Sequence, residues 1–203
     1  QAVIAQKYPL EDDLLTQIVS NLPFSLTSAQ QRVIGEIRDD LTSGFPMNRL
    51  IQGDVGSGKT IVAAIASVAV NSHGAQTAFM APTSILAEQH YQSLQRLLAS
   101  HDGIELPLQS SEIRLLTGDT SAEERQSIAE GLQDGSIKLL IGTHALIEDP
   151  VRFLNLQLAI IDEQHRFGIA QRSALRQKGS NPHLLVMSAT PIPRSLALTL
   201  FGD

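Results

Sequence analysis

At residues 53–60 the chain reads Gly53-Asp54-Val55-Gly56-Ser57-Gly58-Lys59-Thr60, between a short apolar run at 49–52 and a longer one at 61–70. The glycines permit a tight turn whose backbone N–H groups face inward and hold phosphate. The nearly apolar segment 59–71 predicts a buried helix that directs its positive N-terminal end at the same anion. The pattern therefore predicts a phosphate-binding loop, with Lys59 on the β- and γ-phosphates and the Thr60 hydroxyl on Mg²⁺.

Short apolar runs and longer helical segments alternate through the rest of the chain. The runs lack the period-two alternation of half-exposed strands, as expected of parallel strands covered on both faces. Strands are predicted at 49–52, 77–81, 113–116, 138–141, 158–162 and 184–188. Further helices are predicted at 85–99 and at 122–134. The second begins with a capping-box sequence formed by Ser121 and Glu124. Strands and helices in this order predict an α/β fold with right-handed crossovers.

Two adjacent carboxylates, Asp162 and Glu163, stand at the end of the run 158–162. Ligands of a parallel α/β sheet bind at the carboxyl ends of its strands. A P-loop NTPase needs one carboxylate for the Mg²⁺ shell and one group that orients or deprotonates the attacking water. We assign Asp162 to the metal and Glu163 to the water, which makes Lys59, Asp162 and Glu163 the predicted catalytic residues.

The last apolar run ends in Ser188-Ala189-Thr190. Hydroxyl residues at the end of a strand commonly begin a turn. The hydroxyls of Ser188 and Thr190 can also hydrogen-bond the γ-phosphate or the two carboxylates and so report the nucleotide state. Both interpretations stay open from the residues alone.

The composition is that of a soluble globular chain, with 42% hydrophobic and 18% charged residues and no cysteine. The absence of cysteine excludes disulfides, thiolate metal sites and a cysteine nucleophile, and favours a cytoplasmic protein. No apolar run is long enough to span a membrane. Residues 101–136 hold eight acidic and two basic residues, which equals the whole net charge of −6. The acidic total therefore does not exclude phosphate contacts elsewhere.

The first 23 residues differ from the rest because they carry one amphipathic stripe before Pro23. The stripe predicts a helix that packs on the domain, connects it to a preceding domain, or does both. We divide the chain into a helical connecting segment, 1–23, and an ATP-binding domain, 24–203. The stripe consists of Leu14, Leu15, Ile18, Val19 and Leu22.

Together, the phosphate loop, Asp162-Glu163-Gln164-His165 and Ser188-Ala189-Thr190 resemble the first motor domain of a superfamily 2 helicase. That resemblance implies a RecA-like P-loop NTPase, a three-layer αβα sandwich around a mainly parallel sheet. From about Phe24 to Asp203 the chain resembles the RecG family of bacterial ATP-dependent DNA helicases, on the words FSLTSAQQ (24–31), DEQHRFG (162–168) and ATPIPR (189–194). The transcription-repair coupling translocases share the general pattern and the Pro-Ile-Pro-Arg tail, and they are the alternative.

The resemblance implies further residue roles. It assigns Gln30 to the adenine edge, which would give a preference for ATP, and His165 to the link with a second motor domain. Ser188 and Thr190 would couple the nucleotide state to that domain. Contacts to the nucleic-acid backbone, which position a strand without reading its sequence, are assigned to Pro82, Thr83, Thr117, Gly118, Thr143 and His144.

The resemblance also implies partners that these residues do not supply. Family members carry a second RecA-like domain and a wedge domain that splits branched DNA. We therefore expect a bacterial, cytoplasmic monomer that uses ATP and Mg²⁺ on branched or forked DNA in recombination and repair. Because the second domain supplies an arginine that stabilises the transferring phosphate, we expect this chain alone to bind Mg-ATP but hydrolyse it very slowly.

Two other classes of function are weighed against this one. A GTPase-like switch is disfavoured because the chain contains no Asn-Lys-x-Asp base-reading motif. A non-catalytic module that uses nucleotide only to dock on a partner protein is disfavoured because Asp162 and Glu163 are both intact.

Overall fold

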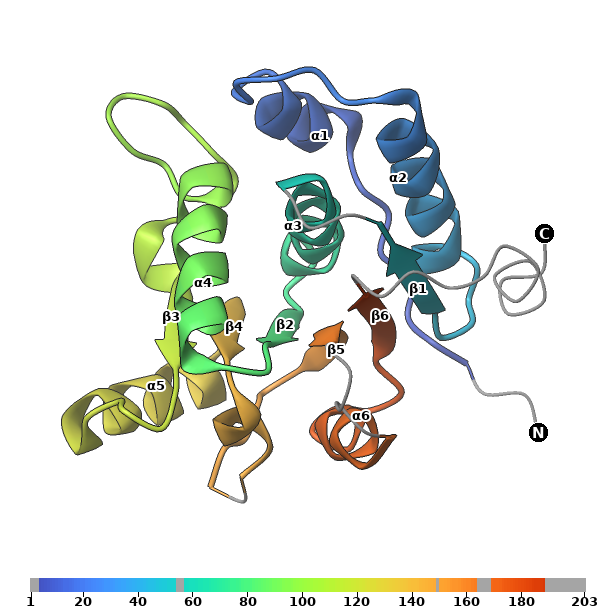
Figure 1. Ribbon diagram of the computed structural model, residues 1–203. Helices are drawn as coiled ribbons and strands as arrows, with labels where there is room; N and C mark the ends of the chain where they lie inside the picture. The colour runs from blue at the N-terminus through green and yellow to red at the C-terminus, as the bar shows by residue number, and fades with distance from the viewer. Residues whose placement is uncertain (1–3, 54–56, 149, 164–168, 189–203) are drawn as a thin grey trace.

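The computed structural model describes residues 4–53, 57–148, 150–163 and 169–188, and it shows a central sheet with helices on both faces (Figure 1). The six strands of the sheet are parallel, in the order β1-β6-β5-β2-β4-β3. The predicted three-layer α/β architecture is therefore confirmed. In chain order the elements are α1 (Asp12–Val19), α2 (Ser28–Leu41), β1 (Asn48–Gln52), α3 (Ser57–Asn71), β2 (Gln76–Met80), α4 (Ser84–Leu98), η1 (Ser110–Glu112), β3 (Ile113–Leu116), α5 (Ala122–Asp134), β4 (Leu139–Gly142), η2 (His144–Ile147), β5 (Leu156–Glu163), α6 (Ile169–Arg176) and β6 (His183–Ser188).

The two faces of the sheet carry separate hydrophobic clusters, because successive side chains of a strand point to opposite faces. On β5, Leu158 and Ile160 belong to the cluster that includes α1 to α4. Ala159 and Ile161 belong to the cluster that includes α5, η2 and α6. Figure 1 shows these two groups of helices on opposite sides of the sheet. The same alternation decides which helices the next two residues of β5 meet.

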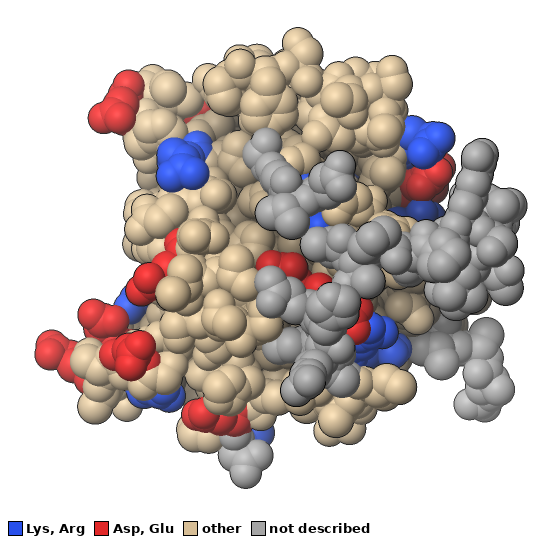
Figure 2. All heavy atoms as spheres, in the orientation of Figure 1, with Lys and Arg blue, Asp and Glu red and all other residues tan. Residues whose placement is uncertain are grey.

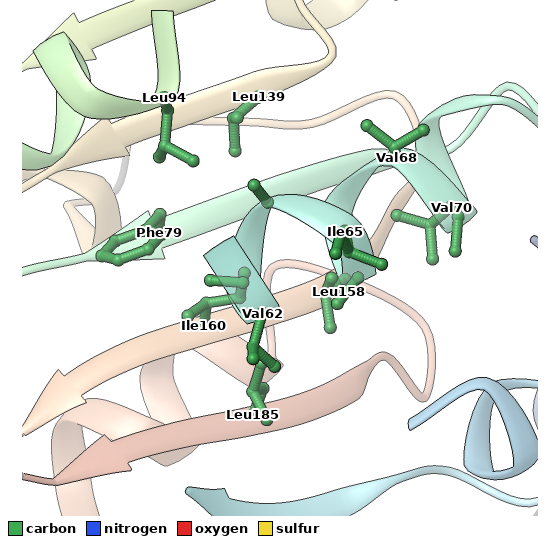
Figure 3. Packing of buried hydrophobic residues seen from close by; sticks show 14 of the residues in the cluster. Val62, Ile65, Val68, Val70, Phe79, Leu94, Leu139, Leu158, Ile160 and Leu185 are labelled. Atoms are coloured by element: carbon green, nitrogen blue, oxygen red, sulfur yellow. The ribbon is translucent and has the colours of Figure 1, made fainter. Parts of the chain in front are cut away.

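Helix α3 lies at the centre of the first cluster. Every residue from position 61 to 71 is buried, as its apolar sequence predicts. Figure 3 shows Val62 next to Leu185 of β6 and Ile65 over Leu158 of β5. Burial of each such side chain contributes about 1.5–3 kcal/mol. The helix that follows the phosphate loop is thus anchored on the middle of the sheet.

The N-terminal segment packs on the same face. Tyr8, Leu10 and Ile18 are buried in the α1–α4 cluster. Arg38 of α2 donates a 2.6 Å hydrogen bond to the Leu10 carbonyl and forms an ion pair with Asp12 at 2.8 Å. The packed helix is therefore confirmed, although α1 ends at Val19 rather than at Pro23. A connection to a preceding domain stays a prediction.

The predicted strands and the helices at 57–71, 84–98 and 122–134 have bounds within about two residues of those expected. Helices α2 and α6 and the short turns η1 and η2 were not predicted. The capping box forms in full at Thr27 and Gln30 of α2. At α5 the Ser121 hydroxyl accepts from the Glu124 N–H at 3.1 Å, and no reciprocal bond from the Glu124 side chain is seen among the described residues. In the described part of the chain, no helix is both long and apolar enough to cross a membrane.

Candidate functional site

The carboxyl ends of three neighbouring strands, β1, β6 and β5, bring the predicted ATP-site residues together. Gln52 pairs in register with Ser188, and Ser188 pairs with Glu163. The Gly53 N–H donates to the Ser188 carbonyl at 3.4 Å. Ser188 therefore lies between Gly53 and Glu163, and its coupling role stays a prediction. We call these three strand ends and the start of α3 the nucleotide half of the edge.

Lys59 and Thr60 lie in the first turn of α3, where helical N–H groups and the helix dipole favour an anion. Thr60 is 8% exposed and Lys59 is half-buried. A Cβ at Gly58 would collide with the Gln30 side-chain amide, so the glycine permits the loop end and α2 to lie in contact. Asp54, Val55 and Gly56 lie outside the described residues, and Ser57 is the first residue of α3.

Gln30 faces the phosphate loop from α2. Its Oε1 accepts the Thr27 N–H at 2.9 Å, while its own N–H donates to the Thr27 hydroxyl at 3.1 Å. The reciprocal pair holds the side chain at the N-terminus of α2, with Nε2 directed at Gly58. Of the two amide groups expected to read adenine, the oxygen is thus engaged within α2 and the nitrogen faces the loop.

Asp162 and Glu163 point to opposite faces of the sheet and have different partners. Asp162 Oδ2 lies 2.6 Å from Nε2 of His90 on α4, and both side chains are largely buried, at 17% and 15% exposed. Glu163 forms an ion pair with Arg172 of α6. Each carboxylate is therefore held by a side chain from a helix on its own face.

The donors at this edge suit a hard divalent cation. Mg²⁺ prefers oxygen ligands and is commonly bound through one or two protein oxygens, the phosphates and water. The Thr60 hydroxyl and the Asp162 carboxylate supply two such oxygens from neighbouring parts of the nucleotide half. The residues present therefore fit the predicted metal.

The carboxyl ends of the other three strands, β2, β4 and β3, carry the residues predicted to contact nucleic acid. Each end has a threonine whose hydroxyl accepts a backbone N–H and fixes a turn. Thr83 accepts from Leu86 at 3.2 Å and caps α4. Thr117 and Thr143 accept from Asp119 and Ala145, at 3.2 and 3.4 Å. We call these three strand ends the threonine half of the edge.

Exposure separates the residues of the threonine half into two groups. Thr117 and Thr143 are buried, at 6% and 3% exposed, so their hydroxyls mainly hold the turns. Thr83, Gly118 and His144 are exposed, and Pro82 is half-buried. The groups accessible to a ligand are thus the Thr83 hydroxyl and the backbone around Gly118 and His144.

Arg125 of α5 joins two turns of the threonine half. Its guanidinium donates to the carbonyls of Thr117 and Thr120 at 2.9 and 3.2 Å. It also lies 3.7 Å from the carboxylate of Glu148, which follows η2. The turn after β3 and the turn after β4 are therefore held by one side chain.

Three partners in this edge were not predicted from the sequence: His90, Arg172 and Arg125. A signal for His90 exists, because it falls in the sheet-facing stripe of α4 with Ala87, Leu94 and Leu98. A polar side chain at a core-facing position needs a partner. Of the predicted residues, His165 and Thr190 lie outside the described part of the chain.

Part of the acidic segment 101–136 lies on α5. Figure 2 shows acidic atoms gathered over α5, at the lower left of the view. Glu123 and Glu124 begin that helix. The segment 101–136, whose charge equals the net −6, thus includes β3 and α5, at the threonine half of the edge.

Comparison with known proteins identifies relatives of the whole chain. The sequence model of the DEAD/DEAH box helicase family matches residues 27–199. The ATP-dependent DNA helicase RecG of Aquifex aeolicus is 50% identical over 201 residues, which is 98% of this chain and 24% of that protein. RecG of Bacillus subtilis is 50% identical over 200 residues, 98% of this chain and 28% of that protein. The chain thus spans about a quarter of the length of these curated relatives.

Solved structures agree with the sequence relatives. A structure of RecG bound to a three-way DNA junction superimposes with a TM-score of 0.82 at 48% identity, covering 98% of this chain and 26% of that one. The DEAD-box helicase Mss116 bound to ssRNA and UDP-BeF superimposes with a TM-score of 0.69 at 18% identity, covering 98% and 44%, and shows the shared fold. The predicted resemblance to RecG and to superfamily 2 is confirmed, and the chain belongs to the DEAD/DEAH box helicase family.

Proposed function

We propose that this chain is the ATP-binding motor portion of a RecG-type DNA helicase that remodels branched DNA, such as forks and Holliday junctions, in recombination and repair. ATP hydrolysis would be coupled to translocation along DNA in the full protein. The observation that carries the proposal is the register of β1, β6 and β5, which puts Gln52, Ser188 and Glu163 in one row at the carboxyl edge.

In the nucleotide half, residues 53–60 form the phosphate cradle and Lys59 contacts the β- and γ-phosphates. Thr60 and Asp162 hold Mg²⁺, which when bound neutralises developing charge on the phosphates. Gln30 reads the adenine edge through its Nε2, because its Oε1 already accepts the Thr27 N–H. Ser188 and Thr190, with His165, report the nucleotide state to a second RecA-like domain.

Glu163 orients or deprotonates the attacking water. It lies in the row that contains Ser188, on the face of the sheet opposite to Asp162. Its ion pair with Arg172 keeps the carboxylate on the α6 side. The two acidic residues thus act from different faces of β5, Asp162 from the α3 and α4 face and Glu163 from the α6 face.

In the threonine half, the exposed groups hold one strand of DNA by its phosphates. Thr83 donates its O–H, since the oxygen already accepts a backbone N–H at the start of α4. Pro82, Gly118 and His144 line the exposed turns, which the buried hydroxyls of Thr117 and Thr143 keep in shape. Neutral contacts of this kind position a strand without reading its sequence.

The proposed partners rest on the RecG relatives of Aquifex aeolicus and Bacillus subtilis, which are about four times as long as the matched region. We propose a monomer in the bacterial cytoplasm whose remaining parts include a wedge domain and the second RecA-like domain. Residues 24–203 form the ATP-binding domain, and residues 1–23 connect it to a preceding part of the protein.

The test is strand separation of a forked DNA by the intact protein, with Lys59→Ala for comparison. We expect ATP-dependent unwinding by the wild type. Loss of one charge-assisted phosphate contact in Lys59→Ala should weaken ATP binding roughly tenfold to a hundredfold. Unchanged ATP affinity in this variant would refute the phosphate cradle. Movement along duplex DNA with displacement of bound protein but without strand separation would favour the transcription-repair coupling type instead.

A further inference from the structure

The bond between His90 and Asp162 crosses the boundary between the two halves of the edge. β2 and β5 are neighbours, and Met80 pairs in register with Ile161. The chain leaves β2 through Pro82 and Thr83 into α4, whereas Asp162 follows Ile161 on β5. His90 therefore lies on the helix that follows the threonine half, but its side chain contacts Asp162 of the nucleotide half.

The ring of His90 has a fixed place in the core. It packs against Phe79 of β2, with ring centroids 4.6 Å apart and planes inclined by 42°. It lies on the buried stripe of α4, between Ala87 and Leu94. The helix and the aromatic contact together fix where Nε2 points, so the ring presents a donor at a defined position.

The contact engages one oxygen of the carboxylate. His90 Nε2 lies 2.6 Å from Asp162 Oδ2, and because the carboxylate oxygen accepts, Nε2 carries the hydrogen. No described residue donates a side-chain hydrogen bond to Oδ1. A donor on one oxygen fixes the carboxylate plane and leaves the other oxygen for a metal or its water, as partners of metal ligands commonly do.

We propose that His90 is a positioning residue for the metal-binding carboxylate of Asp162, and that it ties the Thr83 end of α4 to the metal site. The proposal rests on the proposed function, since it takes Asp162 as a Mg²⁺ ligand and Thr83 as a DNA contact. Thr83 caps α4, and His90 lies about two turns further along the same helix. A shift of α4 on DNA binding would therefore move His90 and change the orientation of the Asp162 carboxylate.

The experiment compares three substitutions of His90 in the intact protein. His90→Gln can place an amide N–H near the position of Nε2. His90→Asn places its amide near Nδ1, too far back for Asp162, and His90→Phe keeps the ring without a donor. The matched control is Gln92→Ala, at an exposed position two residues after His90 on α4.

The first readout is the affinity of a fluorescent ADP analogue with Mg²⁺ and with EDTA, which does not depend on turnover. His90→Phe and His90→Asn should lose about tenfold or more in the Mg²⁺-dependent part of the affinity, the scale seen for lost partners of metal ligands. Their affinity in EDTA should stay at the wild-type value. His90→Gln should recover most of the loss, and Gln92→Ala should show none.

The second readout is the stimulation of ATP hydrolysis by forked DNA, measured at saturating Mg²⁺. His90→Asn and His90→Phe should show a smaller stimulation than His90→Gln, at similar DNA affinity. If all three variants keep the wild-type Mg²⁺ dependence and stimulation, the role of His90 is overturned. Should His90→Phe fail to fold, His90→Asn against His90→Gln still decides the question.

Asp162→Asn distinguishes a failure of the role of His90 from a failure of the proposed function on which it rests. If Asp162→Asn loses the Mg²⁺-dependent affinity while the His90 variants keep it, only the role of His90 fails. If Asp162→Asn also keeps it, the assignment of Asp162 to the metal fails, and the proposed function must be revised first.

Discussion

The nucleotide half and the threonine half lie on one edge of one sheet but are built from different groups. The first presents charged side chains, Lys59, Asp162 and Glu163, and the two carboxylates have partners on neighbouring helices. The second presents neutral hydroxyl and backbone groups at turns that threonines and Arg125 hold in place. Under the proposed function, the charged groups act on the reacting phosphate and the neutral groups hold a DNA strand.

The largest expected effect is that of Glu163→Gln, which removes the group assigned to the attacking water. Loss of a general base commonly lowers turnover by roughly 10²–10⁴-fold. We expect ATP hydrolysis to fall on this scale while the affinities for ATP and for DNA without nucleotide change little. Glu123→Gln, an exposed acidic position on α5, is the control. A comparable loss of DNA affinity in Glu163→Gln would break the division into two halves.

Gly142→Ala should disturb the threonine half next. Gly142 pairs in register with Leu116, and a Cβ there would collide with the Leu116 carbonyl oxygen. Overpacking of this kind costs about 1–3 kcal/mol, which chemical denaturation would measure as a lower free energy of unfolding. DNA affinity should fall more than ATP affinity, because the turns after β3 and β4 start here.

The control for this substitution is Gly35→Ala, within α2, where a Cβ would meet open space. Alanine should stabilise that helix by roughly 0.5–1 kcal/mol. Equal stabilities for Gly142→Ala and the wild type would show that the strand ends can separate without cost.

Arg125→Met tests whether the two turns of the threonine half depend on one side chain. The substitution keeps the alkyl stem but removes the hydrogen bonds to the carbonyls of Thr117 and Thr120. We expect DNA affinity to fall about threefold to tenfold, the scale of one net hydrogen bond, with ATP affinity unchanged. The matched control is Arg114→Met, because the Arg114 guanidinium donates to the Ser127 hydroxyl on α5 at 3.3 Å and not to a turn of the threonine half among the described hydrogen bonds. Equal DNA affinities for the two variants would contradict the role of Arg125.

The smallest expected effect is on the pH dependence of the free energy of unfolding, through His183 at the amino end of the sheet. It should affect both halves of the edge equally, because it acts on the stability of the whole domain. Burial lowers the pKa of His183 below its ordinary value, although its hydrogen bond to the Gln6 carbonyl and the nearby Asp40 act in the opposite direction. The neutral ring also accepts the Met47 N–H at 2.9 Å. The unfolded chain therefore binds a proton more readily than the folded one, so this stability is present above about pH 6.5 and is lost as the pH falls toward the folded pKa.

His183→Asn keeps an acceptor for the Met47 N–H but does not titrate. We expect its free energy of unfolding to vary less than that of the wild type between pH 5 and roughly pH 6.5. Gln92→Ala, a non-titrating exposed position on α4, should keep the wild-type slope. Identical slopes for wild type and His183→Asn would contradict the lowered pKa.

Local patterns predicted which strand ends and which helix carry the nucleotide half, because its residues are adjacent in sequence and each pattern needs one strand end. The loop at 53–60 and the pair Asp162-Glu163 were found this way, and α3 and β5 have the expected bounds within about two residues. The side-chain partners were missed because they depend on strand order. His90 meets Asp162 only because β2 lies beside β5, and Arg172 meets Glu163 only because side chains alternate along β5.

The threonine half shows a different shortfall. Its positions were predicted through a family resemblance, and the structure does place all three turns at neighbouring strand ends. Which groups are exposed could not be predicted, because burial depends on packing between strands. Thr117 and Thr143 turn out to support the turns, and Gly118 and His144 to be accessible.

Hydrogen–deuterium exchange of the intact protein tests the division of the edge most directly, with a Mg²⁺-bound ATP analogue and forked DNA added separately. The analogue should slow exchange at Gly53 and residues 57–60, and the DNA should slow it at residues 83–85, 117–119 and 143–145. Protection of both sets by DNA alone, or of the threonine turns by nucleotide alone at equal strength, would contradict the account.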